Sequence, residues 1–170
     1  MNAHFTRALS LLIGITLSAS ALGQTEPAMM DKRHTGQSFS EPIPHNLCEP
    51  DGVANGGYDL LSYRQDGGPL VGLKEFTVSY NGLKYLFVND NNRVSFLEEP
   101  ERYLPEYNGF CAITLALGRV TCPQYDNFKI EDDKLLLFEV TGFTNGRILW
   151  NSEPADFRSK ADSNFLQIDH

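Results

Sequence analysis

The part of this sequence that looks able to fold contains no histidine. The chain has 170 residues, and its four histidines all lie outside the stretch 46–169: they are His4, His34, His45 and His170. Catalysis by Ser-His-Asp or Cys-His groups, and zinc or copper centres built on histidine, both need this side chain. These familiar kinds of site are therefore excluded from that stretch.

Other chemical signatures are missing as well. The sequence has no CxxC pair, and its three cysteines, Cys48, Cys111 and Cys122, are too scattered to resemble a thiolate metal site. It has neither the GxGxxG nor the GxxxxGK[ST] pattern of nucleotide-binding loops. Its formal net charge of −8 leaves no basic field to attract nucleic acid or an anionic membrane. We therefore expect neither partner, and we expect no cofactor.

Residues 1–23 have the pattern of a secretory signal peptide. Arg7 precedes the apolar stretch ALSLLIGITLSASALG, and Ala21 and Gly23 supply small residues before a cleavage site at Gln24. A transmembrane anchor is the alternative, but the stretch is shorter than the roughly 20 apolar residues that spanning needs. Cleavage removes one positive charge, taking the net charge from −8 to −9. The pattern predicts an extracytoplasmic mature chain, periplasmic or secreted, without a membrane span.

Two regions follow the predicted signal peptide. Residues 24–46 are polar, contain three prolines and show no hydrophobic periodicity, which predicts a flexible arm. Residues 47–168 are enough for one domain with a single core.

Alternation predicts an antiparallel hairpin early in this domain. In EFTVSYNGLKYLFV (75–88), apolar and polar residues alternate on both sides of Asn81-Gly82. Asn-Gly favours a two-residue turn because both residues accept positive φ. The run Tyr58–Tyr63 is predicted to form a further strand, since it is aromatic and apolar and ends at a turn cluster.

The rest of the domain predicts short helices and a second hairpin. NDNNRVSFLEEP (89–100) starts with helix-capping residues and stops at Pro100, so it predicts a short helix with Val94, Phe96 and Leu97 partly inward. FCAITLALG (110–118) predicts a buried helix that ends at Gly118, although a buried strand also fits.

The last third of the domain repeats this mixture. FKIEDDKLLLFEV (128–140) predicts a hairpin that turns at Asp132-Asp133, and RILW and KADSNFLQI predict two helical segments. The order of strands, helices, strands and helices indicates a compact α+β domain of antiparallel β-hairpins and short helices, not a parallel βαβ sheet.

Carboxylates and one sulfur-rich segment are the remaining candidates for chemistry. Two acidic groups, at 98–106 and 131–133, offer acid–base residues, but we interpret them as a solvated face and a turn. Met29, Met30 and His34 are donors that could hold copper weakly, but they lie in the arm rather than in a shaped cavity.

Several motifs together resemble one family. The runs GYDLLSY, EFTVSYNGLKYLF, NRVSFLEEPERYLPEYNGFCA and FKIEDDKLLL, and the closing ILWNSEPADFRSKADSNF, resemble the secreted branch of the YHS-domain proteins over about residues 57–166. The resemblance implies a small α+β domain, and it implies no settled biochemical activity for this branch. Two positions depart from the family pattern: Asn108 replaces the first glycine of a Gly-Gly pair, and Phe110 replaces a tyrosine next to Cys111.

The wider YHS family also implies a metal site, but the corresponding residues are absent here. Metal-linked members carry a Tyr-His-Ser triplet before the hairpin turn and two cysteines after the hairpin. The matching positions of this chain are Phe76, Thr77, Val78, Val88 and Asn92. Valine cannot bind a metal, and a neutral amide is a poor ligand for a soft one. We therefore predict no metal site.

The cysteines separate into two groups once the resemblance is taken into account. Cys48 and Cys122 lie outside the family pattern, in turn-like segments expected to be exposed, and two extra cysteines in an oxidising compartment most simply form a disulfide. A bond between Cys111 and Cys122 is the competing prediction.

Cys111 would then be a free thiol with two possible roles. At the start of a helix its pKa could be lowered, making it a reactive or ligand-holding group with Asp59 and Tyr107 nearby. Alternatively it is a small buried hydrophobe, and the tyrosines around it are packing residues. Tyr58 and Tyr63 complete this candidate ligand site.

The sequence thus predicts an extracytoplasmic, YHS-like binding or accessory module that is non-catalytic. Its partner is an unknown small ligand or a protein. The alternatives are copper handling by analogy with the family and a thiol-dependent redox activity at Cys111.

Overall fold

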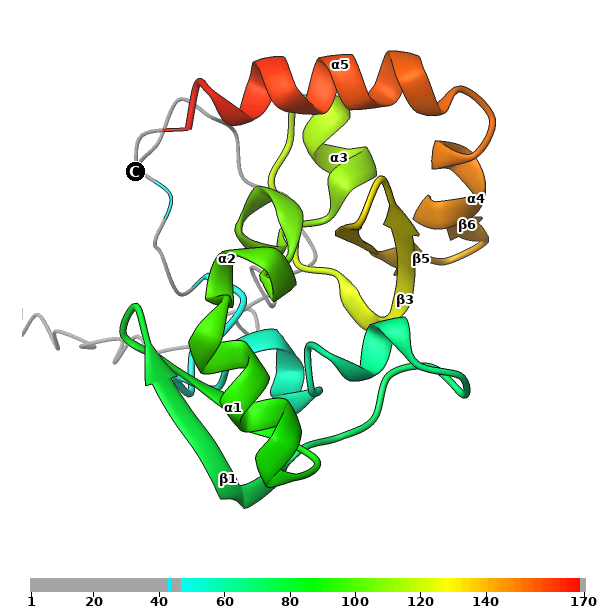
Figure 1. The fold of residues 1–170 in the computed structure, drawn as a ribbon. Helices are drawn as coiled ribbons and strands as arrows, with labels where there is room; N and C mark the ends of the chain where they lie inside the picture. The colour runs from blue at the N-terminus through cyan, green and yellow to red at the C-terminus, as the bar shows by residue number, and fades with distance from the viewer. Residues whose placement is uncertain (1–42, 44–46, 169–170) are drawn as a thin grey trace, which may run out of the picture.

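The structure, a computed structural model, describes Ile43 and residues 47–168. The predicted signal peptide (1–23) and the predicted arm (24–46), except Ile43, lie outside the described residues. The described part combines short helices with antiparallel two-stranded sheets, which confirms the α+β prediction (Figure 1). None of its helices is long and apolar enough to cross a membrane.

The first hairpin pairs β1 (Leu73–Tyr80) with β2 (Leu83–Phe87). Asn81 and Gly82 have φ angles of 46° and 79°, the left-handed geometry that suits a two-residue hairpin turn. The hairpin predicted from Asn-Gly is therefore confirmed.

The second hairpin pairs β3 (Gln124–Glu131) with β4 (Lys134–Phe138). Its turn residues, Asp132 and Asp133, also have positive φ, at 52° and 61°. Aspartate tolerates this region better than most residues, so the predicted turn is confirmed at its expected place.

The helices are short and lie between or beside the hairpins. The Asn89 side chain caps α1 (Asp90–Glu98) by accepting a hydrogen bond from the Asn92 N–H. Phe96 is fully buried, as predicted, whereas Val94 and Leu97 are exposed, because the helix packs on the first hairpin through one narrow face. The other helical elements are α2 (Pro100–Tyr103), α3 (Ala112–Ala116), α4 (Gly146–Trp150), α5 (Pro154–Phe165) and the 3₁₀ turns η2 (Ala54–Gly57), η3 (Ser62–Arg64) and η4 (Glu106–Gly109).

The strand predicted for Tyr58–Tyr63 is wrong. Tyr58 makes only an isolated bridge with Val71, and the chain then turns into η3. Asp59 and Ser62 cause this, because the Leu61 N–H donates to the Asp59 carboxylate and the Ser62 hydroxyl donates to the Asp59 carbonyl. Such local bonds between side chain and backbone compete with the ladder of a strand.

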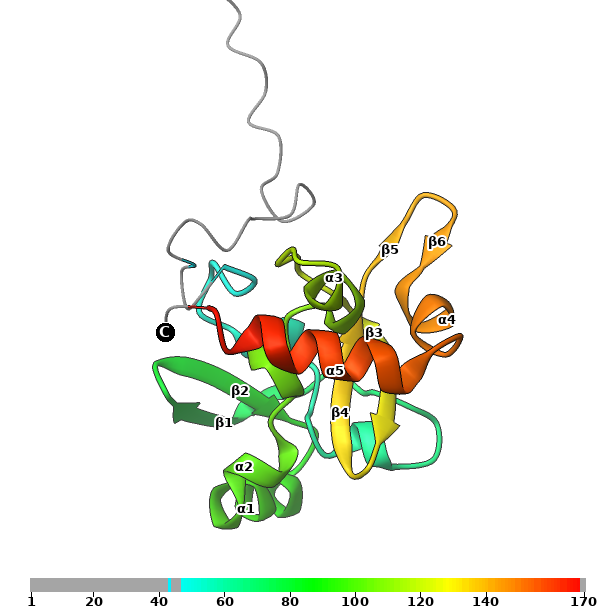
Figure 2. The ribbon, with the colours of Figure 1, turned by 90° about the horizontal axis from the view of Figure 1, so that it is seen from above.

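Strand β4 lies between two hydrophobic clusters and contributes side chains to both. Leu136 and Phe138 belong to a cluster with α3, α4 and α5, while Leu135 and Leu137 belong to a cluster with the first hairpin and α1. Successive residues of a strand point to opposite faces, so a strand buried on both faces reads as a continuous apolar run. Figure 2 shows α5 passing over the second hairpin, beside α3.

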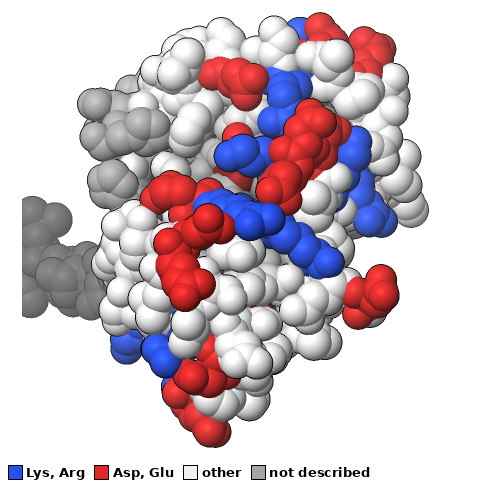
Figure 3. Space-filling view, viewed as in Figure 1, with Lys and Arg blue, Asp and Glu red and all other residues white. Residues whose placement is uncertain are grey.

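The two remaining strands, β5 (Val140–Thr141) and β6 (Thr144–Asn145), form a small hairpin before α4. On the face seen in Figure 3, acidic and basic side chains alternate instead of gathering by sign.

Candidate functional site

A cavity of about 240 Å³ lies where three segments of the chain meet. One wall comes from the loop after Cys48 and from η2, the second from the turn and strand β2 of the first hairpin, and the third from the segment before and within η4. Its lining residues are Glu49, Ala54, Asn55, Asn81, Leu83, Tyr85, Leu104, Pro105, Asn108 and Gly109. Cavities for drug-sized ligands measure roughly 300–1,000 Å³, so this one suits a smaller molecule.

The three walls share an unusual backbone feature. Asn55, Asn81 and Asn108 all have positive φ, between 46° and 54°, and each precedes a glycine in the sequence. Asparagine is the residue that most readily adopts this region besides glycine. At Asn81 this conformation belongs to the hairpin turn. Outside such turns, non-glycine residues in this conformation gather at functional sites more often than elsewhere.

Glu49 is the carboxyl group among the described residues that line the cavity, and only 6% of it is exposed. Burial raises the pKa of its carboxyl from 4.5 to about 7, while hydrogen bonds from the Tyr125 hydroxyl and the Asn55 backbone lower it and the nearby Asp51 raises it. The Tyr125 hydroxyl lies 3.2 Å from both Glu49 Oε1 and the Cys48 carbonyl oxygen. One hydroxyl proton cannot serve both acceptors fully, so a protonated Glu49 suits this arrangement.

Asn55 connects the cavity to the interior through its amide. Its Nδ2 donates to the Tyr63 hydroxyl at 3.0 Å and to the Tyr58 carbonyl at 3.3 Å, which assigns the orientation of the amide. Its Oδ1 is buried and accepts no hydrogen bond within the described part of the chain. A buried polar atom without a hydrogen-bond partner lowers the stability of the fold. In the wall of a cavity, such an atom therefore indicates a place where a ligand could supply the missing bond.

Tyr85 supplies the third polar group. Its ring stacks on Phe96 with 5.1 Å between centroids, which fixes the side chain on the first hairpin. Burial raises the pKa of Tyr85 to about 12, and the charge of Glu49 adds to this rise. The hydroxyl therefore stays protonated near neutral pH and can donate or accept a hydrogen bond.

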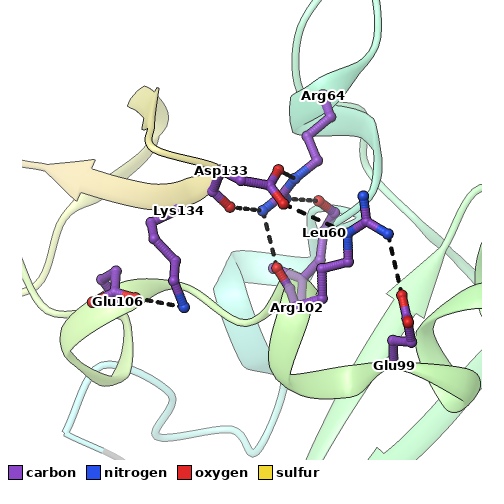
Figure 4. Close-up of polar contacts among 7 residues, drawn as sticks. All are labelled: Leu60, Arg64, Glu99, Arg102, Glu106, Asp133 and Lys134. Atoms are coloured by element: carbon purple, nitrogen blue, oxygen red, sulfur yellow. Dashed lines mark hydrogen bonds and ion pairs between the residues drawn. The ribbon is translucent and has the colours of Figure 1, made fainter.

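The third wall is held in place by ion pairs. Glu106 pairs with Lys134 at 3.2 Å, and Arg102 pairs with Glu99 at 3.2 Å and with Asp133 at 3.6 Å (Figure 4). Glu99, Glu106 and Asp133, which belong to the two acidic groups of the sequence, thus form part of an ion-pair network between α2, η4 and the second hairpin.

Arg64 completes this network from η3. Its guanidinium donates to the Arg102 carbonyl at 3.1 Å and to the Asp133 carbonyl at 3.0 Å (Figure 4). The network thus has a structural role in fixing the loop that carries Pro105 and Asn108.

The five residues of the predicted ligand site do not form one pocket. Cys111 and Tyr107 belong to the cluster with α3 and α5, whereas Tyr63 belongs to the cluster with the first hairpin and Tyr58 packs against it. The rings of Tyr58 and Tyr63 lie 6.5 Å apart. Asp59 is fully buried, and none of the five lines the cavity of Glu49.

Asp59 and Tyr107 each satisfy their polar groups within the fold. The Asp59 carboxylate accepts hydrogen bonds from the Val88 N–H at 2.9 Å and from Asn92 Nδ2 at 2.7 Å, in addition to the bond from Leu61. The Tyr107 hydroxyl donates to Asp162 at 2.8 Å, which ties η4 to α5. Both residues therefore position neighbouring elements.

Cys111 is a buried free thiol, and Cys48–Cys122 is a disulfide, as predicted. Cys48 itself is buried, which differs from the expected exposed turn. Burial raises the pKa of Cys111, so the start of α3 does not activate it as expected. Its sulfur accepts a hydrogen bond from the Glu139 N–H at 3.2 Å.

Sequence reasoning missed Glu49 and Asn55, which carry the polar character of the cavity. Three Asn-Gly pairs lie in the three walls, but Asn145-Gly146 lies outside the cavity, so this pattern alone would not have identified the site. Within Ile43 and residues 47–168, no three His, Cys, Asp or Glu side chains gather as a possible metal site, and the methionines and His34 named above lie outside these residues.

Comparison with protein-family models, with curated proteins and with solved structures finds no match to this chain.

Proposed function

We propose that this protein is a non-catalytic binding module, which works outside the cytoplasm and holds a small polar ligand in the cavity of Glu49, Asn55 and Tyr85. The observation that carries this proposal is the Oδ1 of Asn55, which has no hydrogen-bond partner among the described residues. It belongs to a residue in the wall of a cavity that also contains a buried carboxyl group. A few polar groups converging in a partly apolar cavity are typical of small-molecule sites.

Two further features support the extracytoplasmic part of the proposal. The Cys48–Cys122 disulfide is of a kind that persists in oxidising compartments. The signal-peptide pattern of residues 1–23 and the resemblance to the secreted YHS-domain branch point in the same direction.

The alternative functions gain no comparable support. A thiol-dependent activity needs an accessible thiolate, whereas Cys111 is fully buried and its pKa is raised. Copper handling rests on analogy with a family whose ligand positions hold other residues in this chain.

The proposal is tested by screening small fragments by NMR on the mature, isotopically labelled protein. The set contains neutral, cationic and anionic compounds, and we expect hits to shift the amide signals of Asn55, Asn81 and Asn108. The variant Leu83→Trp, which puts a larger side chain into the cavity wall, should weaken these hits at least about tenfold, since the ring would occupy the ligand volume.

The matched control is Leu73→Trp, on the same hairpin at a half-exposed position that does not line the cavity. It should leave binding unchanged. The proposal fails if no fragment shifts the cavity signals, or if the two tryptophan variants bind the fragments equally well.

A further inference from the structure

The charge distribution around the cavity points to the chemical class of the ligand. Glu49 forms no ion pair within the described part of the chain, and no Lys or Arg lines the cavity. Lys84 lies on the neighbouring strand β2, but its side chain is exposed and makes no ion pair with Glu49. Among the residues that the structure describes, the buried acid of the cavity therefore has no counter-charge.

The described groups that face Glu49 add no positive charge. Tyr125 from β3 and Tyr85 from β2 are neutral hydroxyls, and Asp51 on the same loop is an acid. Glu106 in η4 is already paired with a lysine of β4. An uncompensated buried carboxylate is costly, and a cation that enters its site removes this cost.

We propose that the ligand is a small primary ammonium ion, an inference that rests on the proposed function. Its charged head would lie against the Glu49 carboxylate and donate its other N–H groups to oxygens of the cavity wall. Among the described residues that line the cavity, Asn55, Asn81, Asn108 and Tyr85 have side chains that carry an oxygen acceptor. Leu83, Leu104 and Pro105 offer an apolar surface to a short alkyl chain.

Other ligand classes fit these groups less well. Calcium binds six to eight oxygens, commonly with several carboxylates, and Glu49 is the only carboxylate among the described residues of the lining. A zwitterionic amino acid would bring its own carboxylate into a cavity whose described lining has no basic side chain. A neutral polyol would leave Glu49 without a counter-charge, and so it would bind the protonated form.

The sign of the pH dependence separates an ammonium ion from a neutral ligand. An ammonium ion needs the carboxylate, which forms as the pH rises through about 7, the pKa of Glu49. The ionised fraction grows about tenfold between about pH 6 and about pH 8, and the affinity should grow by the same factor. A ligand that prefers the neutral acid shows the opposite trend.

The test is calorimetric titration of the mature protein with butylammonium chloride at about pH 6 and about pH 8, in buffers free of amines. 1-Butanol is the neutral comparison and calcium chloride the metal comparison. We expect butylammonium to bind about tenfold more tightly at the higher pH. Glu49→Gln should abolish this gain while the far-ultraviolet circular dichroism stays unchanged, because glutamine resembles the protonated acid in shape.

Glu98→Gln is the matched control, since Glu98 is an exposed acid of α1 that does not line the cavity. It should keep the pH dependence, and Tyr85→Phe should weaken butylammonium without changing the dependence. One outcome contradicts the ammonium assignment alone: butanol binds, Leu83→Trp removes this binding, and butylammonium gains no affinity at the higher pH. The protein would then still be a binding module, but not one for ammonium ions. Tighter binding of calcium than of butylammonium also overturns the ammonium assignment. Failure of every probe overturns both proposals.

Discussion

Cys111 shows at the scale of one residue how environment decides chemistry. Its sequence position at the start of a helix suggested a lowered pKa, but its side chain is fully buried. Loss of solvent disfavours the thiolate and outweighs the hydrogen bonds from Thr114 and Glu139, so the pKa rises. The residue therefore behaves as a small core side chain.

We predict that iodoacetamide labels Cys111 only when the protein unfolds. At neutral pH the thiol is both inaccessible and protonated, and alkylation requires an exposed thiolate. Mass spectrometry after native and denaturing alkylation measures this, with complete labelling in denaturant as the control. Rapid native labelling near neutral pH would contradict the packing role and revive thiol chemistry.

The raised pKa of Glu49 leads to a prediction about how the stability of the fold depends on pH. The unfolded group loses its proton near 4.5 and the folded group near 7, so the folded state holds the extra proton in this window. Stability from Glu49 is fully present below about 4.5 and is lost as the pH rises through about 7, by on the order of 3 kcal/mol.

Urea unfolding of the wild type and of Glu49→Gln measures this effect across that pH window. The difference in unfolding free energy between the two proteins should shift in favour of the variant as the pH rises, then stay constant above about 8. A constant difference from about pH 4.5 to 8 would show that Glu49 has an ordinary pKa in the folded protein.

At the scale of elements, local signals predicted the hairpins and most of the helices correctly. Asn81-Gly82 and Asp132-Asp133 adopt the positive φ values that tight turns need, and this depends only on neighbouring residues. The strand predicted for Tyr58–Tyr63 was wrong because Asp59 and Ser62 form hydrogen bonds with the local backbone. The apolar content of the segment does not reveal these bonds.

Gly72 provides an element-scale prediction about how the chain enters β1. A Cβ at this position would lie 2.3 Å from the carbonyl carbon and 2.5 Å from the oxygen of Leu86 in β2. Gly72→Ala must therefore displace backbone and should lower the unfolding free energy by about 1–3 kcal/mol. Chemical denaturation measures this, and Val71→Ala, which is largely exposed, should change it by less than about 0.5 kcal/mol. Equal effects of the two variants would argue against close packing at Gly72.

At the scale of the whole molecule, the disulfide joins the loop before η2 to the chain that enters β3. Cys48 and Cys122 are separated by 74 residues, and the bond sits in the cluster that also holds Cys111. Because Glu49 follows Cys48 directly, the disulfide also anchors one wall of the cavity.

We predict that the double variant Cys48→Ala/Cys122→Ala loses about 4 kcal/mol of unfolding free energy, the chain-entropy value for a loop of this length. It should also lose fragment binding, since the wall with Glu49 is released. Urea unfolding with and without a reductant measures the first effect, and the reductant should leave the double variant unchanged. A loss below about 1 kcal/mol would mean that packing alone holds the loop.

Neighbouring residues are enough to specify the two hairpins, the α1 cap, the buried α3 segment and the overall α+β class. The candidate site, in contrast, depends on how distant segments pack. Glu49, Asn55, Tyr85 and Asn108 come from segments far apart in the chain, and only their packing creates a cavity and raises the pKa of Glu49. The burial of Glu49 depends on all the surrounding elements together, so a local sequence pattern cannot predict it.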